Sequence, residues 1–278
     1  MNVVNTNINS VVAKNAMAVN QRDLTSAVQQ LSTGKRINGA ADDAAGLAIS
    51  NKLGSRIVSL DMAVRNANDG ISLLQTADGA AGVLSDMLFR MRELAVQAGN
   101  DTNSTSDRTA LQAEVATLQS QIGNTLNNTT WNDMKVLNGE AGSSGSVAFH
   151  VGPDSTDSIT VSMASLNVGD LASAQSSASV DVSTLSGATS ALTIIDDALT
   201  EIDEARSRWG ATANRLTHAA DNATNVSLNS ALSRSHVMDT DYAQATAELA
   251  RSMILDQAGV AMLSQANQQP IYVLALLR

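Results

Sequence analysis

The sequence of 278 residues contains no cysteine, only two prolines and only 2% aromatic residues. Without cysteine there is no disulfide, no thiolate nucleophile and no zinc–thiolate site, so packing alone must hold the fold. The two prolines, Pro153 and Pro270, leave every other stretch free to form uninterrupted helix, because an internal proline costs about 3 kcal/mol. Few aromatic side chains are available to line a ligand pocket. These absences favour long helices packed through aliphatic side chains.

Long hydrophobic runs are also missing. The apolar run from Val273 to Leu277 is far shorter than the roughly 18 residues that a membrane-spanning helix needs. Residues 1–10 lack a basic segment followed by an apolar core, which is the pattern of a cleaved signal peptide. We therefore expect no membrane insertion, and we expect any secretion to use a route without a cleaved signal peptide.

The charge is negative and unevenly distributed. The formal net charge is −10, which argues against a nucleic-acid partner, because phosphate contacts need clustered Lys and Arg. Residues 1–42 and 237–278 together hold six bases and six acids, so residues 43–236, with 11 bases and 21 acids, carry the whole −10. We expect the neutral ends to pack against one another and the charged middle to face water.

Apolar residues recur at alternating spacings of three and four, which is the pattern of a coiled-coil seam. The first seam contains Ile57, Leu60, Val64, Ala67, Ile71 and Leu74, and after Asp78 it resumes, displaced by one position, at Ala81, Leu84, Leu88, Met91, Ala95 and Ala98. This pattern predicts one helix over residues 44–98, roughly 80 Å long at 1.5 Å per residue.

Turn-forming residues over 99–107 predict a chain reversal, after which two more seams follow. These seams contain Leu111, Val115, Leu118, Ile122 and Leu126, and then Leu192, Ile195, Leu199, Ile202, Ala205, Trp209, Ala213, Leu216, Ala220, Ala223 and Val226. Between them the period changes to two, which predicts a small antiparallel β-hairpin element within residues 131–168. The composition of residues 170–190 predicts a loop. The expected fold is mainly α, an elongated antiparallel helical bundle or coiled coil.

The two ends of the chain form thin amphipathic helices. Their apolar positions include Val4, Ile8, Val11, Leu24, Val28 and Leu31 at one end and Leu249, Met253, Val260 and Leu263 at the other. A helix of about 25 residues with one apolar stripe cannot offset its ordering entropy alone. We therefore expect residues 1–42 and 237–278 to be terminal arms, largely disordered alone, that become helical on docking with each other and with neighbouring copies. Residues 43–236 would form the outward-facing bundle.

No pattern of catalytic or ligand-binding residues stands out. The three histidines, His150, His218 and His236, lie far apart, and there is no HExxH pair for zinc. Adjacent acids such as Asp42 and Asp43 point in different directions on a helix and are not expected to share a proton. Motifs for nucleotide binding and for a hydrolase nucleophile are also missing. We expect no cofactor, no metal and no enzymatic activity.

Segments near both ends resemble a known family. Residues 31–51 (LSTGKRINGAADDAAGLAISN), 66–79 (NANDGISLLQTADG) and 92–98 (RELAVQA) are similar to the N-terminal half of bacterial flagellin. Residues 239–269 (DTDYAQATAELARSMILDQAGVAMLSQANQQ) and 273–278 (VLALLR) are similar to its C-terminal half. The resemblance covers about residues 1–140 and 190–278.

The resemblance implies a structural subunit of the bacterial flagellar filament, an extracellular helical homopolymer that acts as a propeller for swimming. The N- and C-terminal helices would pair in the inner core of the filament. Implied partners are an export chaperone at the C-terminal arm, the filament cap and the hook-junction proteins, and the implied export route is a type III pathway. The short interval between the β element and the last bundle helix implies a short form without extra outer domains.

Flagellins are also ligands of an innate-immune Toll-like receptor. The resemblance places the matching positions at Arg90, Leu94 and Glu114, with Phe89 in place of the polar residue expected beside Arg90. Without the resemblance, Arg90 and Glu114 would be interpreted as ion-pairing surface residues, each pair worth under about 1 kcal/mol.

Two other functions remain open at this point. A hook–filament junction protein would share similar ends but usually has a longer middle, and a flagellin-like adhesin or glycan-binding protein would use the β element. Gly70, Gly79 and Gly82 lie within the long predicted helix, where each costs up to about 1 kcal/mol. They indicate either close packing, which is favoured, or a site where subunits slide between two packings.

Overall fold

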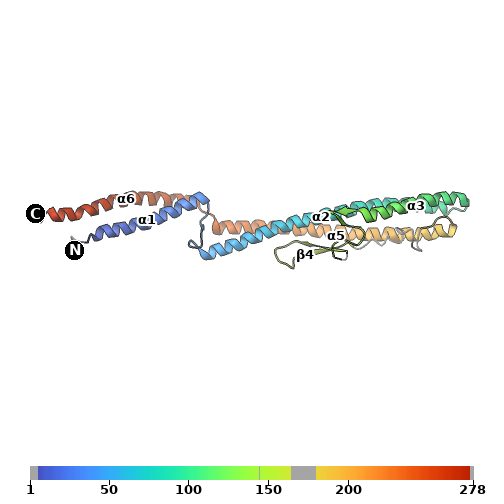
Figure 1. The fold of residues 1–278 in the computed structure, drawn as a ribbon, viewed down its shortest axis with the longest axis horizontal. Helices are drawn as coiled ribbons and strands as arrows, with labels where there is room; N and C mark the ends of the chain where they lie inside the picture. Colours follow the sequence, from blue (N-terminus) through green and yellow to red (C-terminus); the bar gives the residue numbers. More distant parts are fainter. Residues whose placement is uncertain (1–5, 144, 164–179, 276–278) are drawn as a thin grey trace. The chain divides into compact units, whose positions relative to one another are not determined.

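The computed structural model describes residues 6–143, 145–163 and 180–275. Within these ranges the chain is mainly helical, with two short antiparallel strand pairs, which confirms the expected fold class (Figure 1). The elements in chain order are α1 (Ile8–Thr33), α2 (Ala44–Ala98), α3 (Thr105–Asn128), β1 (Thr130–Trp131), β2 (Met134–Lys135), β3 (Ser146–His150), β4 (Ser158–Ser162), α5 (Leu185–Met238) and α6 (Tyr242–Ala275).

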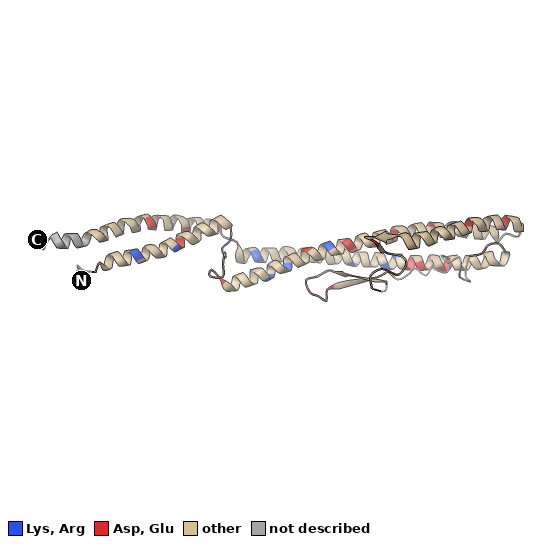
Figure 2. Ribbon diagram, viewed as in Figure 1, with Lys and Arg blue, Asp and Glu red and all other residues tan. Residues whose placement is uncertain are grey.

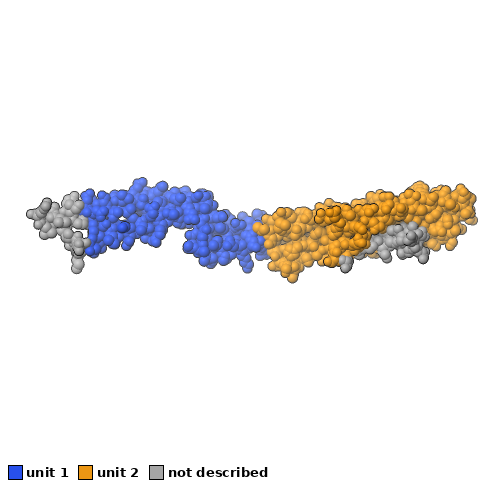
Figure 3. All heavy atoms as spheres, in the orientation of Figure 1, with its two compact units in different colours: residues 1–57, 228–278 blue, residues 58–227 orange. Residues whose placement is uncertain are grey.

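The chain forms two compact units (Figure 3). Unit 1 comprises residues 1–57 and 228–278, and unit 2 comprises residues 58–227. Unit 1 therefore contains α1 and α6, whereas unit 2 contains α3, the strands and most of α2 and α5.

Unit 2 is built on the antiparallel pair α2 and α5. Arg92 Nε donates to Asp196 Oδ1 at 2.8 Å, Arg206 Nε donates to Asp78 Oδ1 at 2.7 Å, and Ser227 Oγ donates to Asp61 Oδ1 at 3.0 Å. Residue numbers thus rise along α2 as they fall along α5. The predicted seam residues lie between the helices and have no exposed surface at Ala81, Leu84, Leu88, Met91, Ala95 and Ala98. The prediction of one helix over 44–98 is confirmed.

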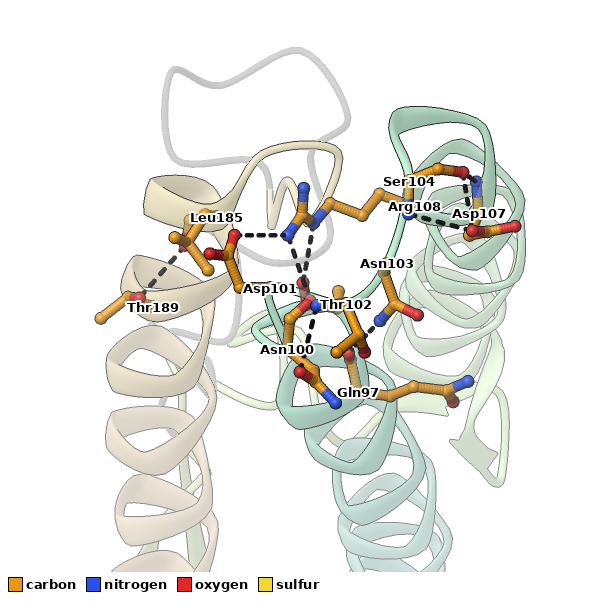
Figure 4. A network of polar contacts seen from close by, with 11 residues as sticks. Gln97, Asn100, Asp101, Thr102, Asn103, Ser104, Asp107, Arg108, Leu185 and Thr189 are labelled. Carbon is orange, nitrogen blue, oxygen red and sulfur yellow. Dashed lines mark hydrogen bonds and ion pairs between the residues drawn. The ribbon is translucent and has the colours of Figure 1, made fainter.

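The reversal between α2 and α3 is held by side chains that cap both helix ends (Figure 4). Arg108 donates from Nε to Ala98 O at 2.9 Å and from a terminal nitrogen to Asn100 O at 3.1 Å, so it satisfies carbonyls at the end of α2. Ser104 and Asp107 form a capping box, each accepting a hydrogen bond from the other's backbone N–H. Because this box starts α3 at Thr105, the predicted loop over 99–107 is wrong for its last three residues.

Two hairpins occupy the region predicted to contain the β element. β1 and β2 are joined by Asn132 and Asp133, both with positive φ (48° and 62°), as a two-residue type I′ turn requires. β3 and β4 pair antiparallel with Phe149 opposite Ile159, and both of these side chains are buried. Residues 164–168 of the predicted element lie outside the described residues.

The β3–β4 hairpin packs on the two long helices. Asn66 Nδ2 of α2 donates to His150 O at 2.9 Å, and Trp209 Nε1 of α5 donates to Ser162 O at 3.3 Å. A Cβ added at Gly70 would lie 3.1 Å from Phe149 Cγ and 3.0 Å from Leu216 Cδ1. Gly70 therefore leaves room for the aromatic ring on α2.

The other two glycines behave differently. Among the described residues, no atom lies within 4 Å of a Cβ added at Gly79 or Gly82. For these two glycines, close packing within one copy is therefore wrong as far as the described part of the chain extends.

The start of α5 also differs from the prediction. Residues 185–190 were expected in a loop, but α5 begins at Leu185, and residues 170–179 lie outside the described residues. Thr184 explains the early start, because its hydroxyl accepts from Gly187 N at 3.0 Å and its carbonyl accepts from Ala188 N at 2.9 Å. Ser, Thr and Ala are compatible with both a loop and a capped first turn of a helix, so their frequency alone does not locate the start of α5.

Candidate assembly surface

In unit 1, α1 and α6, which come from opposite ends of the chain, lie side by side as an antiparallel pair (Figure 1). Asn7 Nδ2 donates to Ala266 O at 2.7 Å, and Asn20 Nδ2 donates to Ser252 O at 2.8 Å. Just after α1 ends and just before α6 begins, Thr240 N donates to Gly34 O at 3.0 Å. Polar contacts therefore fix the register of the two helices at both ends and in the middle.

The seam between α1 and α6 is made of small side chains. Ala27, Ala245, Ser252 and Ala266 are its buried residues. Gly259 receives the side chain of Met17 so closely that an added Cβ would lie 2.9 Å from Met17 Cγ. Small residues in the seam let the helices approach, and they leave the large apolar side chains elsewhere.

Five of the ten large apolar side chains predicted for assembly are exposed rather than buried in this seam. Ile8, Val11, Val28, Met253 and Val260 are each half or more exposed, at 50–55%. Leu24, Leu31, Leu249 and Leu263 are half-buried near the seam, and Val4 lies outside the described residues. The predicted residues thus fall into a pairing group and an exposed group.

Sequence reasoning missed part of the exposed group. Val12, Val19, Ile254, Leu255 and Met262 are also largely exposed on α1 and α6. A single stripe per helix does not include them, although adjacent apolar pairs such as Val11-Val12 and Ile254-Leu255 indicate an apolar surface wider than one seam.

Part of the exposed group lines a groove of about 570 Å³ that runs between α1 and α6. Its apolar walls come from Val12, Ala16 and Met17 on α1 and from Leu255, Ala258 and Met262 on α6. A groove with apolar walls along two helices can accept another apolar helix face, because burial there removes apolar surface from water.

The predicted receptor-contact residues lie in unit 2 on α2 and α3. Arg90 donates to Glu114 Oε1 from Nε at 2.9 Å and from a terminal nitrogen at 2.8 Å, and it also contacts Glu93 at 2.9 Å. The hydrogen bonds to Glu114 and then to Glu93 raise the pKa of Arg90 above its ordinary value. Leu94, by contrast, is 1% exposed and belongs to the core. The structure brings Arg90 and Glu114 together at the surface and places Leu94 beneath it.

Two further features concern the whole of the described chain. Across residues 6–143, 145–163 and 180–275, no helix is both long and apolar enough to cross a membrane. Over the same ranges, no group of three His, Asp or Glu side chains could hold a metal ion.

Two protein-family models match the N-terminal and C-terminal parts of the chain. The family model for the bacterial flagellin N-terminal helical region matches residues 4–141, and the model for the bacterial flagellin C-terminal helical region matches residues 192–277. The chain belongs to the bacterial flagellin family. This flagellin is 41% identical over 276 residues to the flagellin of Halalkalibacterium halodurans, covering 99% of this chain and all of that one. It is 34% identical to the flagellin of Bacillus subtilis, with 99% of each chain covered.

Solved structures agree with this assignment. The crystal structure of Bacillus cereus flagellin matches with a TM-score of 0.50 and 29% identity, over 57% of this chain and 88% of that one. A putative flagellar hook-associated protein from Vibrio parahaemolyticus matches with a TM-score of 0.58 but 12% identity, over 71% of this chain and all of that one, so it shares the fold alone.

The family assignment establishes the biological role. This flagellin is a structural subunit of the extracellular bacterial flagellar filament and polymerises with itself. It is a short form, because only residues 142–191 separate the two matched regions, and its flagellin relatives are structural proteins.

Proposed function

We propose that this flagellin polymerises through the exposed apolar faces of α1 and α6, with residues 1–42 and 237–278 in the inner core of the filament and residues 43–236 facing outward. The observation that carries this proposal is the concentration of exposed large apolar side chains on these two helices. Five lie on α1, namely Ile8, Val11, Val12, Val19 and Val28, and six lie on α6, namely Tyr242, Met253, Ile254, Leu255, Val260 and Met262.

The magnitudes support assembly through this surface. Each of these eleven side chains is already about half buried, so burying the rest recovers about half of the roughly 1.5–3 kcal/mol of full burial, a gross gain of roughly 8–16 kcal/mol in all. Association costs roughly 4–15 kcal/mol in lost freedom of motion. The gain is comparable to the cost, so loss of a few of these side chains should prevent polymerisation. The arms are expected to become ordered as they dock. The pair α1 and α6 buries only small side chains between its helices, so it has little hydrophobic core of its own.

Seeded growth tests this proposal. Purified monomer is added to short filament fragments, and elongation is followed by electron microscopy for the full chain, for a chain lacking residues 237–278 and for a Val260→Asp variant. Ser155→Asp, an exposed position between β3 and β4, is the matched control because it adds the same charge away from α1 and α6. We expect elongation by the full chain and the control only. Elongation by Val260→Asp at the wild-type rate would contradict the proposed surface.

Recognition by the innate-immune Toll-like receptor is a second candidate function of the monomer. Its support is the exposed pair of Arg90 and Glu114, whose side chains are 51% and 45% exposed. Buried Leu94 would position this part of α2 rather than contact the receptor. In a cell reporter assay we expect a response to the monomer that falls with Arg90→Ala and not with Arg208→Ala, a similar exposed ion-pairing arginine on α5. No response to the wild-type monomer would contradict the proposal.

The remaining proposed partners follow from the same apolar faces. An export chaperone would cover the exposed side of α6 before secretion, and the cap and hook-junction proteins would meet the arms at the ends of the filament. Catalysis forms no part of this proposal.

A further inference from the structure

The charges of α2 and α5 are segregated by half-helix (Figure 2). Residues 44–68 of α2 hold three bases and one acid, whereas residues 69–98 hold two bases and four acids. Residues 185–205 of α5 hold no base and five acids, whereas residues 206–238 hold four bases and one acid. Each long helix therefore has a basic half and an acidic half.

Antiparallel pairing brings halves of the same sign together, except at the boundary between the halves, where Arg206 of α5 pairs with Asp78 of α2. The basic half of α2 contacts the basic half of α5 in unit 2 through Asp61 and Ser227 and in unit 1 through Ser50 and Met238. The acidic halves meet at Arg92 and Asp196, and α3 joins them through Arg90 and Glu114. The basic halves together hold seven bases and two acids, a net +5, and the acidic halves with α3 hold three bases and eleven acids, a net −8.

Stability of a single copy does not explain this arrangement. The helix dipole favours acids near the N-terminus and bases near the C-terminus, which suits α5 but is the reverse of the order in α2. Opposite signs on facing helices would give more ion pairs within the chain. Instead Arg56, Arg65 and Arg215 are exposed without an ion pair, and so are Asp86 and Asp197, as far as the described residues extend. Like charges side by side destabilise a copy on its own.

We propose that neighbouring copies of this flagellin pack with an axial offset that places the basic halves of α2 and α5 of one copy against the acidic halves of the next. Side by side in register, two copies would set like charges against each other. An offset of about half of α2, on the order of 40 Å, sets opposite charges against each other. The partner is thus a second copy, and the charges determine its axial offset. The inference rests on the proposed function, because it assumes that copies assemble.

Charge exchange at constant net charge tests the offset. The variant Arg65→Asp with Asp86→Arg keeps the net charge but moves charge between the halves, so it weakens the segregation. The matched control, Arg65→Asp with Asp221→Arg, exchanges charge within the basic halves, breaks no hydrogen bond or ion pair among the described residues, and preserves the segregation. All three positions are exposed, and circular dichroism melting verifies that each variant folds. Seeded elongation is measured at about 10 mM and about 1 M NaCl, where the screening length is about 30 Å and about 3 Å.

We expect the first variant to elongate at least about threefold more slowly than wild type in low salt, with the difference vanishing in high salt, because opposite charges raise association rates only when unscreened. The control should match wild type in both. Equal elongation by both variants, or equal slowing of both, would overturn the inference. Elongation by wild type with no effect of either exchange would leave the proposed apolar surface standing, whereas failure of wild type to extend seeds would count against that surface instead.

Discussion

Replacing the glycines of α2 with alanine should change stability in opposite directions at two positions of one helix. Alanine in a helix interior is favoured over glycine by up to about 1 kcal/mol. In the part of the chain that the structure describes, no atom lies within 4 Å of a Cβ added at Gly79, so Gly79→Ala should gain about this amount. At Gly70 the added Cβ would lie 3.0 Å from Leu216 Cδ1 and 3.1 Å from Phe149 Cγ.

The contacts at Gly70 should outweigh the gain. Leu216 has no exposed surface and Phe149 is 9% exposed, so neither side chain can move aside freely. Overpacking a dense core typically costs about 1–3 kcal/mol. Gly70→Ala should therefore destabilise unit 2 by about 1 kcal/mol net, while Gly79→Ala stabilises it by a similar amount. At about 2–4 °C per kcal/mol for a unit of this size, the two melting temperatures should differ by about 4–8 °C.

Thermal unfolding of the monomer, followed by circular dichroism, measures both effects. A double-mutant cycle with Phe149→Ala isolates the cause, because Gly70→Ala should cost less once the ring is gone. The reasoning is refuted if Gly70→Ala raises the melting temperature as much as Gly79→Ala does, or if the cycle shows no coupling between Gly70 and Phe149.

Three further predictions concern polar groups of unit 2. Arg108→Ala should lower the free energy of unfolding in urea by about 1.5–3 kcal/mol, because carbonyls at the end of α2 lose a charged donor. Asp101→Ala should lower it by under about 1 kcal/mol, because the Asp101 side chain is 93% exposed and lies 3.9 Å from Arg108. Gln112→Ala should cost about 2–4 kcal/mol, since its amide accepts from Val182 N and donates to Val180 O. The Ser104 hydroxyl and backbone N–H lower the pKa of Asp107, so its stabilising effect is present above its ordinary pKa and is lost as the pH falls through the lower folded value. Melting temperatures between about pH 5 and pH 2 should therefore fall less steeply in Asp107→Asn.

The helices of unit 2 could be predicted from the sequence because one physical signal decides them. The residues of the predicted seams of α2, α3 and α5 are buried or half-buried, as their spacing indicates, because each helix covers an apolar stripe against its neighbours. The helix starts at Thr105 and Leu185 could not be placed from composition, because one side-chain contact decides each. The turn at Asn132-Asp133 was missed although two residues that tolerate positive φ, placed between Trp131 and Met134, are a hairpin signal.

The terminal arms show why the candidate assembly surface could be predicted only in part. Periodicity identifies apolar residues but not the partner that covers them, and we propose two partners for α1, namely α6 within the chain and a neighbouring copy. Its small and polar residues, such as Asn20 and Ala27, face α6, whereas Val11 and Val28 remain exposed. A helix that pairs within its own chain through small residues leaves its large apolar side chains available for the contacts that we propose with neighbouring copies. The separation of small from large side chains on α1 and α6 is therefore the feature by which intrachain and interchain contacts can be told apart, and it is visible only when the register of the two helices is known.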